Sequence, residues 1–416
     1  PSKSLLLIAQ DIFNSDDSFS LSDTQLKAFE HIVETIQNIS KYKKSVIVIK
    51  GGPGTGKSLL GLKILGYFAL NHGLKINYAV GNSSFQTNIA GSLAQAVKNK
   101  KLNEDIDFNY LFSSFRSSYD KSNNFFDLMI CDEAQRLQPD SSTVYSKVEK
   151  QLEQSLEVML ASKVSIFLID ENQRVRQSDI GSVQRIKETS EYLKTEYHEV
   201  NLVEQFRCSN SEDYIATINS IFEIEGYEKY TAKTNQYDFK RFMTPNEMEI
   251  ALEEKIESNY KARILAGYCW KWTKTKKKTD TLVNDIQIGN WHKPWNRADT
   301  GGKSYNRANY HWANTPECFN QIGCIHTSHG IEFDYVGIIL GGDLIRRNNK
   351  WICNVEKVFD SGFKSGISKN KDMMTLLLKN IYRILFTRGS KGCYFYSTDE
   401  ETGKYIEEQL KEKINR

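Results

Sequence analysis

The sequence has no uninterrupted apolar run of membrane-spanning length and no Cys-x-x-Cys pair. A membrane helix needs about 18 or more consecutive apolar residues, and the N-terminus also lacks the basic-then-apolar layout of a signal peptide. We therefore expect a cytoplasmic protein that has no membrane partner. The seven cysteines, an odd number, fit a reducing compartment better than a disulfide framework.

Proline and glycine are few, with 6 and 25 residues, and neither sign of charge is in excess, because 55 Lys and Arg face 52 Asp and Glu. The net charge of +3 excludes a protein-wide basic surface, so any face that binds nucleic acid must be local. Hydrophobic residues at 39% and charged residues at 26% are typical of a folded chain rather than a disordered or collagenous one.

The length of 416 residues exceeds what one small core needs, so we expect two domains. The chain begins at Pro1 with no methionine before it. This start leaves open whether the chain is a processed product or a fragment of a longer protein.

Short β-type runs alternate with helix-length stretches along most of the chain. Residues 22–39 and 59–70 have helical apolar spacing, and residues 45–50 form a β-branched run between them. The alternation predicts an α/β fold with mainly parallel, doubly wound sheets. The remaining predicted strands form two series, at residues 75–80, 125–132, 164–170 and 198–203 and at residues 263–268, 322–326, 335–340 and 393–397.

The two series of strands predict two lobes with a boundary near Asn201. We expect an N-terminal lobe over residues 1–200 and a C-terminal lobe over residues 201–416. The alternation fails between residues 270 and 314, where lysines are followed by tryptophans and tyrosines amid Gly, Asn and Arg. We interpret this stretch as a basic and aromatic insertion in the second lobe.

A complete phosphate-binding loop lies between the first predicted strand and the next helix. It satisfies the spacing G-x-x-x-x-G-K-[ST] with Gly51, Gly52, Pro53, Gly54, Thr55, Gly56, Lys57 and Ser58. Glycines let the backbone curl around phosphates, Lys57 supplies positive charge, and Ser58 is a ligand for Mg²⁺. The alternative, a glycine-rich turn without a ligand, does not explain the flanking strand and helix. The loop therefore predicts a site for ATP and Mg²⁺.

An acidic pair, Asp132 and Glu133, ends the apolar run of residues 125–131. The carboxyl end of a buried parallel strand lies beside the phosphate-binding loop in such sheets. We predict that Asp132 holds Mg²⁺, directly or through water, and that Glu133 polarises the attacking water. The alternative is a solvated acidic strand end.

A P-loop and an acidic pair occur in kinases, GTPases, transporters and motors, so further motifs are needed to distinguish these classes. Five blocks occur in a fixed order and together resemble the series of superfamily one helicases: residues 132–135 (Asp-Glu-Ala-Gln), 170–173 (Asp-Glu-Asn-Gln), 205–207 (Gln-Phe-Arg), 326–334 (His-Thr-Ser-His-Gly-Ile-Glu-Phe-Asp) and 386–389 (Phe-Thr-Arg-Gly).

Over nearly its whole length the chain resembles the Schlafen-like group 3 helicase-domain family, because residues 1–5, 266–268, 294–296 and 323–327 also look like blocks of that family. The resemblance implies two RecA-like lobes, ATP hydrolysis with Mg²⁺, and single-stranded DNA or RNA as a partner. Members of the family are often joined to an upstream nuclease-like domain, which leaves such a domain or a partner protein open here.

The resemblance also implies roles for single residues around the nucleotide. Gln25 matches the position that reads the adenine edge, but Ser22-x-x-Gln25 is equally a capping box that satisfies a helix N-terminus. Gln173 matches the residue that senses the γ-phosphate or its water, although Ile169 replaces the glycine usual in this block. Arg207 and Arg388 match the two arginines of the second lobe that follow charge on the phosphate, the alternative for each being a surface salt bridge.

The block at residues 326–334 carries three further implied contacts. Glu332 matches the acid that contacts the ribose, and Gly330 would let the backbone approach the nucleotide or the strand closely. The family more often has Gln at the position of His329, for which the resemblance implies a strand-facing role. Zinc binding by Cys318, Cys324 and the nearby histidines is discounted, because the helicase block already explains the histidines.

The sequence also offers candidates for contact with a nucleic-acid strand. Flat rings for stacking and cations for phosphates are interleaved in the predicted insertion, with Trp270, Trp272 and Trp295 as the candidate rings. The alternative is a solvated loop whose tryptophans pack a small core of its own. Asn82 and Thr87 follow a predicted strand where related motors hold the strand backbone, although small polar residues are common there without function.

These motifs favour a motor in which ATP hydrolysis drives translocation or unwinding of nucleic acid. A second hypothesis is a nucleotide-gated switch that controls a partner or an attached effector without processive unwinding. A P-loop kinase is a poor third reading, because it gives no role to Arg207, Glu332 and Arg388 as an ordered set. Nothing in the sequence distinguishes DNA from RNA.

Overall fold

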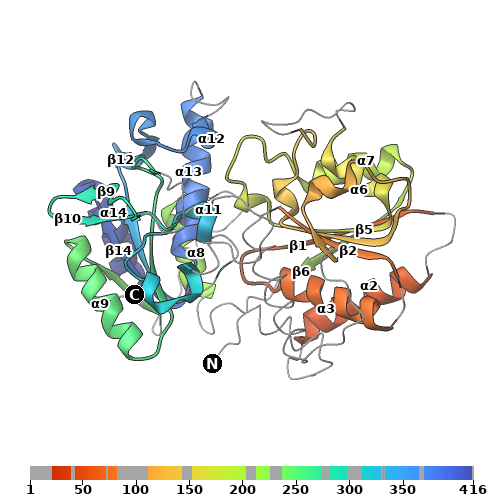
Figure 1. The fold of residues 1–416 in the computed structure, drawn as a ribbon, viewed down its shortest axis with the longest axis horizontal. Helices are drawn as coiled ribbons and strands as arrows, with labels where there is room; N and C mark the ends of the chain where they lie inside the picture. The colour runs from red at the N-terminus through yellow and green to blue at the C-terminus, as the bar shows by residue number, and fades with distance from the viewer. Residues whose placement is uncertain are drawn as a thin grey trace. The chain divides into compact units, whose positions relative to one another are not determined.

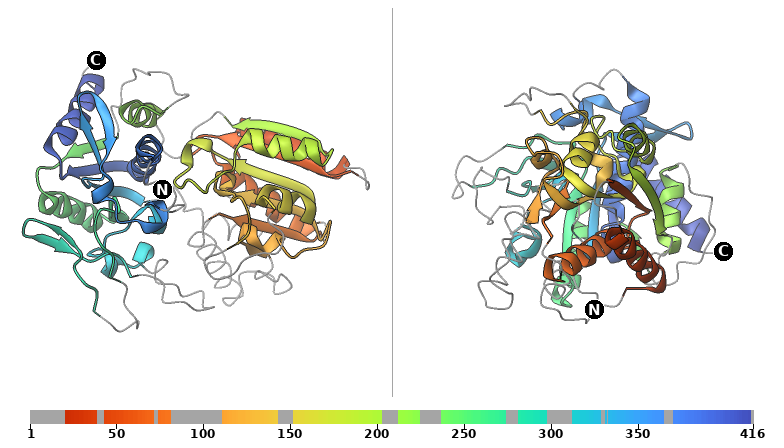
Figure 2. Two further views of the ribbon diagram at one scale, coloured as in Figure 1. Left: turned by 90° about the horizontal axis from the view of Figure 1, so that it is seen from above. Right: turned by 90° about the vertical axis from the view of Figure 1, so that its right-hand side faces the viewer.

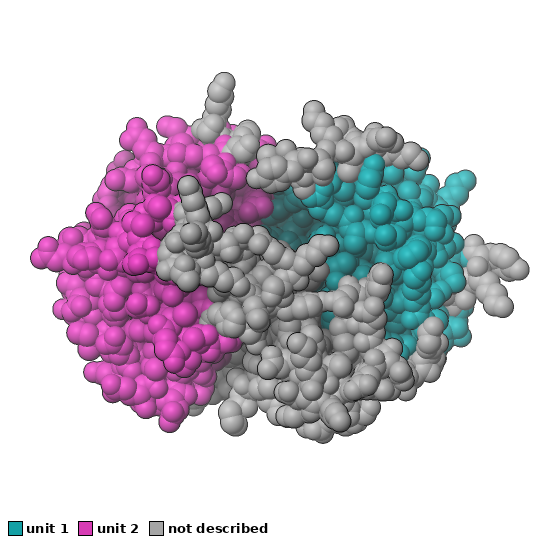
Figure 3. All heavy atoms as spheres, in the orientation of Figure 1, with its two compact units in different colours: residues 1–174, 178–207 teal, residues 175–177, 208–416 magenta. Residues whose placement is uncertain are grey.

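The computed structural model describes residues 21–38, 43–71, 74–81, 111–142, 152–202, 212–224, 237–273, 281–297, 312–328, 331, 333–364 and 370–414. The chain divides into two compact units, here called unit 1 (residues 1–174 and 178–207) and unit 2 (residues 175–177 and 208–416), which Figure 3 shows in teal and magenta. We predicted a boundary near Asn201. The division instead follows residue 207, and the short segment Val175–Gln177 is also part of unit 2.

Unit 1 is built on a six-stranded sheet in which every pair of neighbouring strands is parallel. The order is β3 (Phe112–Ser113), β2 (Ile76–Val80), β4 (Phe126–Asp132), β5 (Ser162–Ile169), β1 (Ser45–Gly51) and β6 (Glu196–Leu202). A single strand, β5, therefore separates the P-loop strand from the strand that ends in the acidic pair. This is the strand order of a RecA-like lobe, and it brings the two motifs to one edge of the sheet.

Helices cover both faces of this sheet, as Figures 1 and 2 show. Helices α2 (Asp23–Asn38) and α3 (Lys57–Asn71) lie on one face, and α6 (Gln154–Ala161) and α7 (Val183–Tyr192) lie on the other. Successive residues of a strand point to opposite faces. Accordingly Ile47 and Ile49 join the core under α2 and α3, whereas Val46 and Val48 join the core under α6 and α7. Burial on both faces explains why the strands read as continuous apolar runs.

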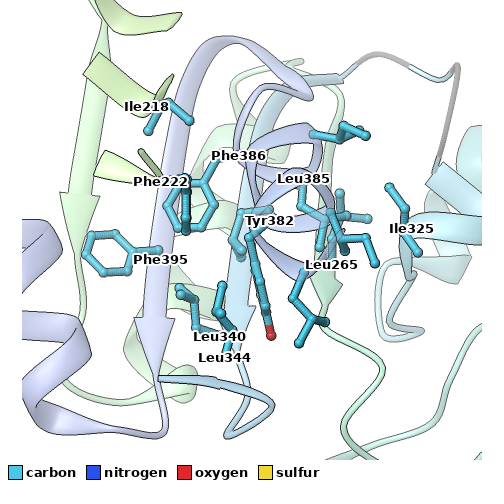
Figure 4. Packing of buried hydrophobic residues seen from close by; sticks show 14 of the residues in the cluster. Ile218, Phe222, Leu265, Ile325, Leu340, Leu344, Tyr382, Leu385, Phe386 and Phe395 are labelled. Atoms are coloured by element: carbon cyan, nitrogen blue, oxygen red, sulfur yellow. The ribbon is translucent and has the colours of Figure 1, made fainter. Parts of the chain in front are cut away.

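Unit 2 has a four-stranded sheet that is also wholly parallel. Its order is β7 (Asp238–Arg241), β14 (Gly389–Ser397), β11 (Phe333–Leu340) and β8 (Ala262–Ala266). Helices α8 (Glu212–Ile221), α13 (Lys371–Phe386) and α14 (Glu400–Ile414) contribute to the larger core of the unit, and α9 (Pro245–Glu257) contributes to a second core. Figure 4 shows rings and aliphatic side chains of the larger core, among them Phe222, Tyr382, Phe386 and Phe395.

Val175 is a member of this larger core and is 1% exposed. The chain on both sides of the segment Val175–Gln177 belongs to unit 1. One core side chain of unit 2 is therefore supplied from within the sequence of unit 1.

The smaller elements lie between these helices and strands. The strands are β9 (Ile286–Ile288), β10 (Trp291–Lys293), β12 (Leu344–Arg347) and β13 (Lys350–Cys353), and the short helices are α11 (Ile325–Ser328), α12 (Ser361–Lys364), η1 (Phe115–Ser118), η2 (Ala134–Arg136), η3 (Glu171–Gln173), η4 (Pro316–Cys318) and η5 (Val355–Lys357). No helix among the described residues has the length and apolar character needed to cross a bilayer.

The predicted α/β class with mainly parallel sheets is confirmed. The strand predicted at residues 322–326 is wrong, because Ile322 and Gly323 make only isolated bridges and α11 begins at Ile325. Local hydrogen bonds turn the chain there. Thr327 Oγ1 accepts from the N–H of Cys324 at 3.0 Å, and Ser328 Oγ donates to the carbonyl of Cys324 at 2.8 Å. Such side-chain bonds to nearby backbone compete with a strand ladder.

Candidate active site

The P-loop connects β1 to α3 with a backbone that only glycine adopts easily. Gly54 and Gly56 have φ of +80° and +81°, in the left-handed region that favours residues without a Cβ. A Cβ on Gly56 would lie 2.1 Å from Nε2 of Gln25. The sequence therefore specifies both the curl of the loop and the close approach of Gln25.

Lys57, the first residue of α3, folds its side chain back over the loop. Its Nζ donates hydrogen bonds to the carbonyls of Gly51 and Gly52 at 2.7 and 2.9 Å. Thr55 Oγ1 donates to the same Gly52 carbonyl at 3.0 Å. The loop thus combines a left-handed glycine curl, a helix N-terminus and a lysine ammonium, and these are the groups that a triphosphate requires.

Both the oxygen and the nitrogen of the Gln25 amide make structural hydrogen bonds. Ser22 N–H donates to Oε1 at 3.2 Å and Gln25 N–H donates to Ser22 Oγ at 3.3 Å, so the capping box is formed. The Nε2 group donates to the carbonyl of Thr55 at 3.0 Å, and the side chain is only 3% exposed. Gln25 therefore joins the start of α2 to the P-loop. Its adenine-reading role stays a prediction.

Asp132 ends β4 as a fully enclosed carboxylate, 1% exposed. Its Oδ2 accepts a hydrogen bond from Tyr78 Oη at 2.8 Å, and its Oδ1 accepts one from the N–H of Glu133 at 2.9 Å. The Ser58 hydroxyl lies near this carboxylate and favours its charged form. Burial and the charge of Glu133 raise the pKa of Asp132, against the opposing effects of Ser58, Tyr78 and Lys57. The two residues expected to hold Mg²⁺ therefore lie near each other.

Glu133 has a left-handed backbone, with φ of 59° and ψ of 45°. Such a conformation in a residue other than glycine costs on the order of 1–3 kcal/mol and persists only where the surrounding structure holds it. The carboxylate accepts a hydrogen bond from Nε2 of Gln135. The strained turn and this bond together fix where the carboxylate of Glu133 lies.

Gln135 extends the network to the next strand of the sheet. It is 0% exposed, and its Oε1 accepts the backbone N–H of Asp170, which follows β5, at 3.3 Å. Asp170 in turn accepts a hydrogen bond from Nε2 of Gln173 at 2.8 Å, and Gln173 is 4% exposed. A continuous chain of hydrogen bonds therefore joins Glu133 to Gln173.

Sequence reasoning missed two residues of this site, Tyr78 and Gln135. Tyr78 lies within an apolar predicted strand, and only its hydroxyl group distinguishes it from the core residues around it. Gln135 was recognised as part of a motif but was given no role. Both become visible only when the neighbouring strands are placed side by side.

Several predicted residues lie outside the described residues, namely Asn82, Thr87, Arg207, His329, Gly330 and Glu332. Arg388 is described, between α13 and β14 of unit 2, and it is 2% exposed. Its Nε donates to the carbonyl of Ile384 at 3.1 Å. The surface salt bridge considered as its alternative does not fit this burial.

The tryptophans of the predicted insertion differ in exposure. Trp295 is 1% exposed, and its Nε1 donates to the carbonyl of Lys271 at 3.0 Å, so its ring is not available to stack on a base. We therefore correct this candidate. Trp272 is half-buried and stacks on Trp295 with ring centroids 5.4 Å apart, and Trp270 is also half-buried. Trp295 instead supports the more exposed ring.

His326 is bound by protein groups rather than placed in a cluster of metal ligands. Its Nε2 lies 2.5 Å from Oδ2 of Asp360, and its Nδ1 lies 3.4 Å from Nη2 of Arg176. Burial raises the pKa of the Cys324 thiol to about 11, which disfavours a thiolate ligand. Among the described residues, no group of three or more His, Cys, Asp or Glu side chains is arranged to hold a metal.

Comparison with known proteins gives relatives at low identity. An uncharacterised protein of Saccharomyces cerevisiae is 24% identical in an alignment 445 residues long. The alignment covers 95% of this chain and 92% of that protein. The Pif1 helicase of Candida albicans is 10% identical with a TM-score of 0.39, over 94% of this chain and 99% of that chain. The DNA-bound helicase MrfA is 9% identical with a TM-score of 0.40, over 98% and 50% of the two chains.

The family comparison is more specific than these relatives. The model of the Schlafen group 3 DNA/RNA helicase domain matches residues 44–399, which include the P-loop, the acidic pair, Gln173 and Arg388. The match extends over most of the chain and contains the hydrogen-bonded network described above. This protein therefore belongs to the Schlafen group 3 DNA/RNA helicase-domain family.

Proposed function

We propose that this protein binds and hydrolyses ATP at the edge of the unit 1 sheet and couples hydrolysis to movement along single-stranded nucleic acid. The observation that carries the proposal is one hydrogen-bonded network beside the P-loop, in which Asp132 accepts from the N–H of Glu133, and Glu133 is joined through Gln135 and Asp170 to Gln173. Phosphoryl transfer needs these groups together, since it depends on positioning and charge neutralisation.

Each of the unit 1 residues has its own role in the proposed reaction. Lys57 and the N–H groups of the loop bind the phosphates, and Ser58 and Asp132 are the residues that would hold magnesium. The bound ion would neutralise charge on the phosphate oxygens. Glu133 orients the attacking water and accepts its proton, and Gln173 positions the same water or the γ-phosphate.

Family membership supports adding further residues to this proposal. We assign Arg388, and likewise Arg207, to stabilisation of charge on the transferred phosphoryl group, for which a planar and permanently charged guanidinium is suited. Glu332 would contact the ribose, and Gly330 would allow close approach of the backbone. For the strand we retain Trp270, Trp272, Asn82, Thr87 and His329.

The test is the ATPase rate of the purified protein with and without single-stranded DNA and RNA. A motor should hydrolyse ATP faster when a strand is bound, and the better of the two strands identifies the preferred substrate. Lys57→Ala, which removes the loop cation, is the control that should lose nucleotide binding or turnover. If neither single-stranded DNA nor single-stranded RNA at saturating concentration changes the ATPase rate, the motor is excluded.

The second candidate is a nucleotide-gated switch that acts on a partner or an attached effector. The intact Glu133 and its network favour an active ATPase but do not require strand movement. Strand displacement measured in parallel with ATPase separates the two functions. Stimulated hydrolysis without unwinding or translocation would favour the switch.

A further inference from the structure

The carboxylate of Asp132 has a partner that none of the helicase motifs includes. Tyr78, in the middle of β2, donates from Oη to Oδ2 of Asp132 at 2.8 Å. Tyr78 is 0% exposed and Asp132 is 1% exposed, so water does not compete for this bond. We propose that Tyr78 is a positioning residue that fixes the carboxylate of Asp132 for the magnesium ion of the ATP site, an inference that rests on the proposed function.

The two oxygens of the Asp132 carboxylate are held by different groups. Oδ2 accepts from Tyr78 and Oδ1 accepts from the N–H of Glu133 at 2.9 Å, so each oxygen has its own donor. Rotation of the carboxylate would break both bonds, and the plane of the group is therefore set. Polar partners that orient metal ligands typically account for about 10–100-fold in metal affinity.

Tyr78 is itself held on several sides. Its ring contacts Phe112 with centroids 5.6 Å apart, and its backbone pairs with Ile130 on β4. A Cβ on Gly61 of α3 would lie 3.1 Å from Oη of Tyr78 and 2.6 Å from Leu168 Cδ1, so the helix passes close to the hydroxyl. Packing of this density leaves the hydroxyl one position. A phenylalanine would keep the ring contacts and remove only the hydrogen bond.

Unit 2 offers a matched control for that change. Tyr382, 0% exposed, donates from Oη to Oδ1 of the buried Asp343 at 2.5 Å. The pair has the same chemistry as Tyr78 and Asp132 but belongs to the core of the other unit. Tyr382→Phe removes this buried Tyr–Asp bond, together with the bond that Tyr382 Oη accepts from the N–H of Gly341 at 3.1 Å, and measures what these losses do to the fold.

The experiment is a Mg²⁺ titration of fluorescent ADP binding to the whole chain, carried out on the wild type, Tyr78→Phe and Tyr382→Phe. Tyr78→Phe should raise the half-saturating Mg²⁺ concentration about tenfold, equivalent to about 1.4 kcal/mol. Nucleotide affinity without Mg²⁺ should stay at the wild-type value, because the P-loop is unchanged. Tyr382→Phe should keep the wild-type Mg²⁺ midpoint.

Two outcomes overturn the inference on its own: a wild-type Mg²⁺ midpoint in Tyr78→Phe, or the same shift in Tyr382→Phe, which would make the effect one of general destabilisation. A wild-type protein that binds ADP equally well with and without Mg²⁺ overturns the proposed site and the inference with it. The wild-type titration therefore distinguishes the two failures.

Discussion

Gln135 donates a hydrogen bond to the carboxylate of Glu133 while its own carbonyl oxygen accepts the N–H of Asp170. One buried amide thus connects the acid that we propose orients the attacking water to the turn that carries Gln173. An amide is suited to this position because it has a donor and an acceptor on one planar group. A side chain with only one of these functions would leave a buried polar group without its partner.

Gln135→Leu should lower kcat by about 10²-fold, because misplacement of a catalytic group by about 1 Å has this effect. Nucleotide affinity should change little, since the P-loop does not contact Gln135 in the network described. Single-turnover hydrolysis and ADP binding are the measurements. Gln138→Leu, a change in the same loop of a glutamine that bonds to Asp179 and the Arg136 carbonyl, is the control. An equal loss of kcat in both variants would count against the role of Gln135.

Arg388→Ala should keep ATP binding and lower turnover by about 10³-fold or more, the typical contribution of a phosphate-sensing arginine. Arg388→Lys should recover only part of this loss, because an ammonium lacks the planar fork of guanidinium donors. Binding and steady-state kinetics measured together separate the two steps. Arg383→Lys is the control for burial, since Arg383 is 0% exposed on α13, the helix that precedes Arg388. Normal turnover in Arg388→Ala would remove this residue from the mechanism.

Gly56→Ala and Gly289→Ala separate backbone strain from steric conflict. Both glycines have positive φ, +81° and +57°, but a Cβ on Gly289 meets nothing within 4 Å, whereas one on Gly56 meets Gln25. Each variant should lose about 1 kcal/mol of unfolding free energy for the conformation alone. Only Gly56→Ala should also weaken nucleotide binding, measured with fluorescent ADP. Equal nucleotide affinity in the two variants would contradict the packing of Gln25 against the loop.

Glu157 should make the stability of unit 1 depend on pH. Burial raises the pKa of this carboxyl to about 7, against the hydrogen bond from Ser141, and its Oε1 has no hydrogen-bond partner. The folded state therefore holds its proton at a pH where the unfolded chain, with a pKa near 4.5, has lost it. The stabilisation is fully present below about pH 4.5 and is lost as the pH rises through about 7.

Glu157→Gln should flatten this pH dependence and raise the melting temperature at pH 8 by about 2–4 °C, as a gain of about 1 kcal/mol would do. Thermal unfolding between pH 4.5 and 8 measures it. Glu191→Gln, a change at an exposed glutamate of α7, is the control. If the wild type and Glu157→Gln have parallel stability curves across this range, the ionisation of Glu157 is not the cause.

Trp272→Leu should weaken binding of a short single-stranded oligonucleotide about tenfold, because stacking contributes about 1–3 kcal/mol for each base. Trp272 can stack because its neighbour Trp295 supports it from the core. Fluorescence anisotropy at fixed salt is the measurement. Tyr192→Ala, at a ring that is 77% exposed on unit 1, is the control for unspecific stacking. If Trp272→Leu binds the oligonucleotide with wild-type affinity, Trp272 does not contact the strand.

The central parts of the fold were predictable because they obey local rules. An apolar run followed by a glycine-rich loop and a helical run predicted β1, the P-loop and α3, and the same reasoning placed Asp132 at a strand end. These elements are buried on both faces, so the hydrophobic pattern carries nearly all of the signal. For Glu133 and Gln173 the sequence predicted only that the two residues lie in one site. It did not predict the hydrogen bonds between them, because the linking atoms belong to Gln135 and Asp170.

Other parts were not predictable because tertiary contacts decide them. The edge strand β7 has few apolar residues and gave no strand signal, yet it pairs with β14 through backbone hydrogen bonds. The apolar residues 322–326 resemble a strand, but hydrogen bonds from Thr327 and Ser328 turn them into the start of α11. The sequence leaves open whether Trp295 stacks on a base or packs in a small core, and only its ring contacts with Tyr268 and Trp272 show that it is buried.

The place of Val175 in the core of unit 2 has a consequence for how this protein can be divided. A fragment that starts at residue 208 would contain every strand of the unit 2 sheet and still lack one of its buried side chains. Loss of a core aliphatic group leaves a cavity that neighbouring residues fill only in part. The residues of unit 2 are thus not consecutive in the sequence, and a gene truncation that treats the units as consecutive modules would remove a side chain from the core of unit 2.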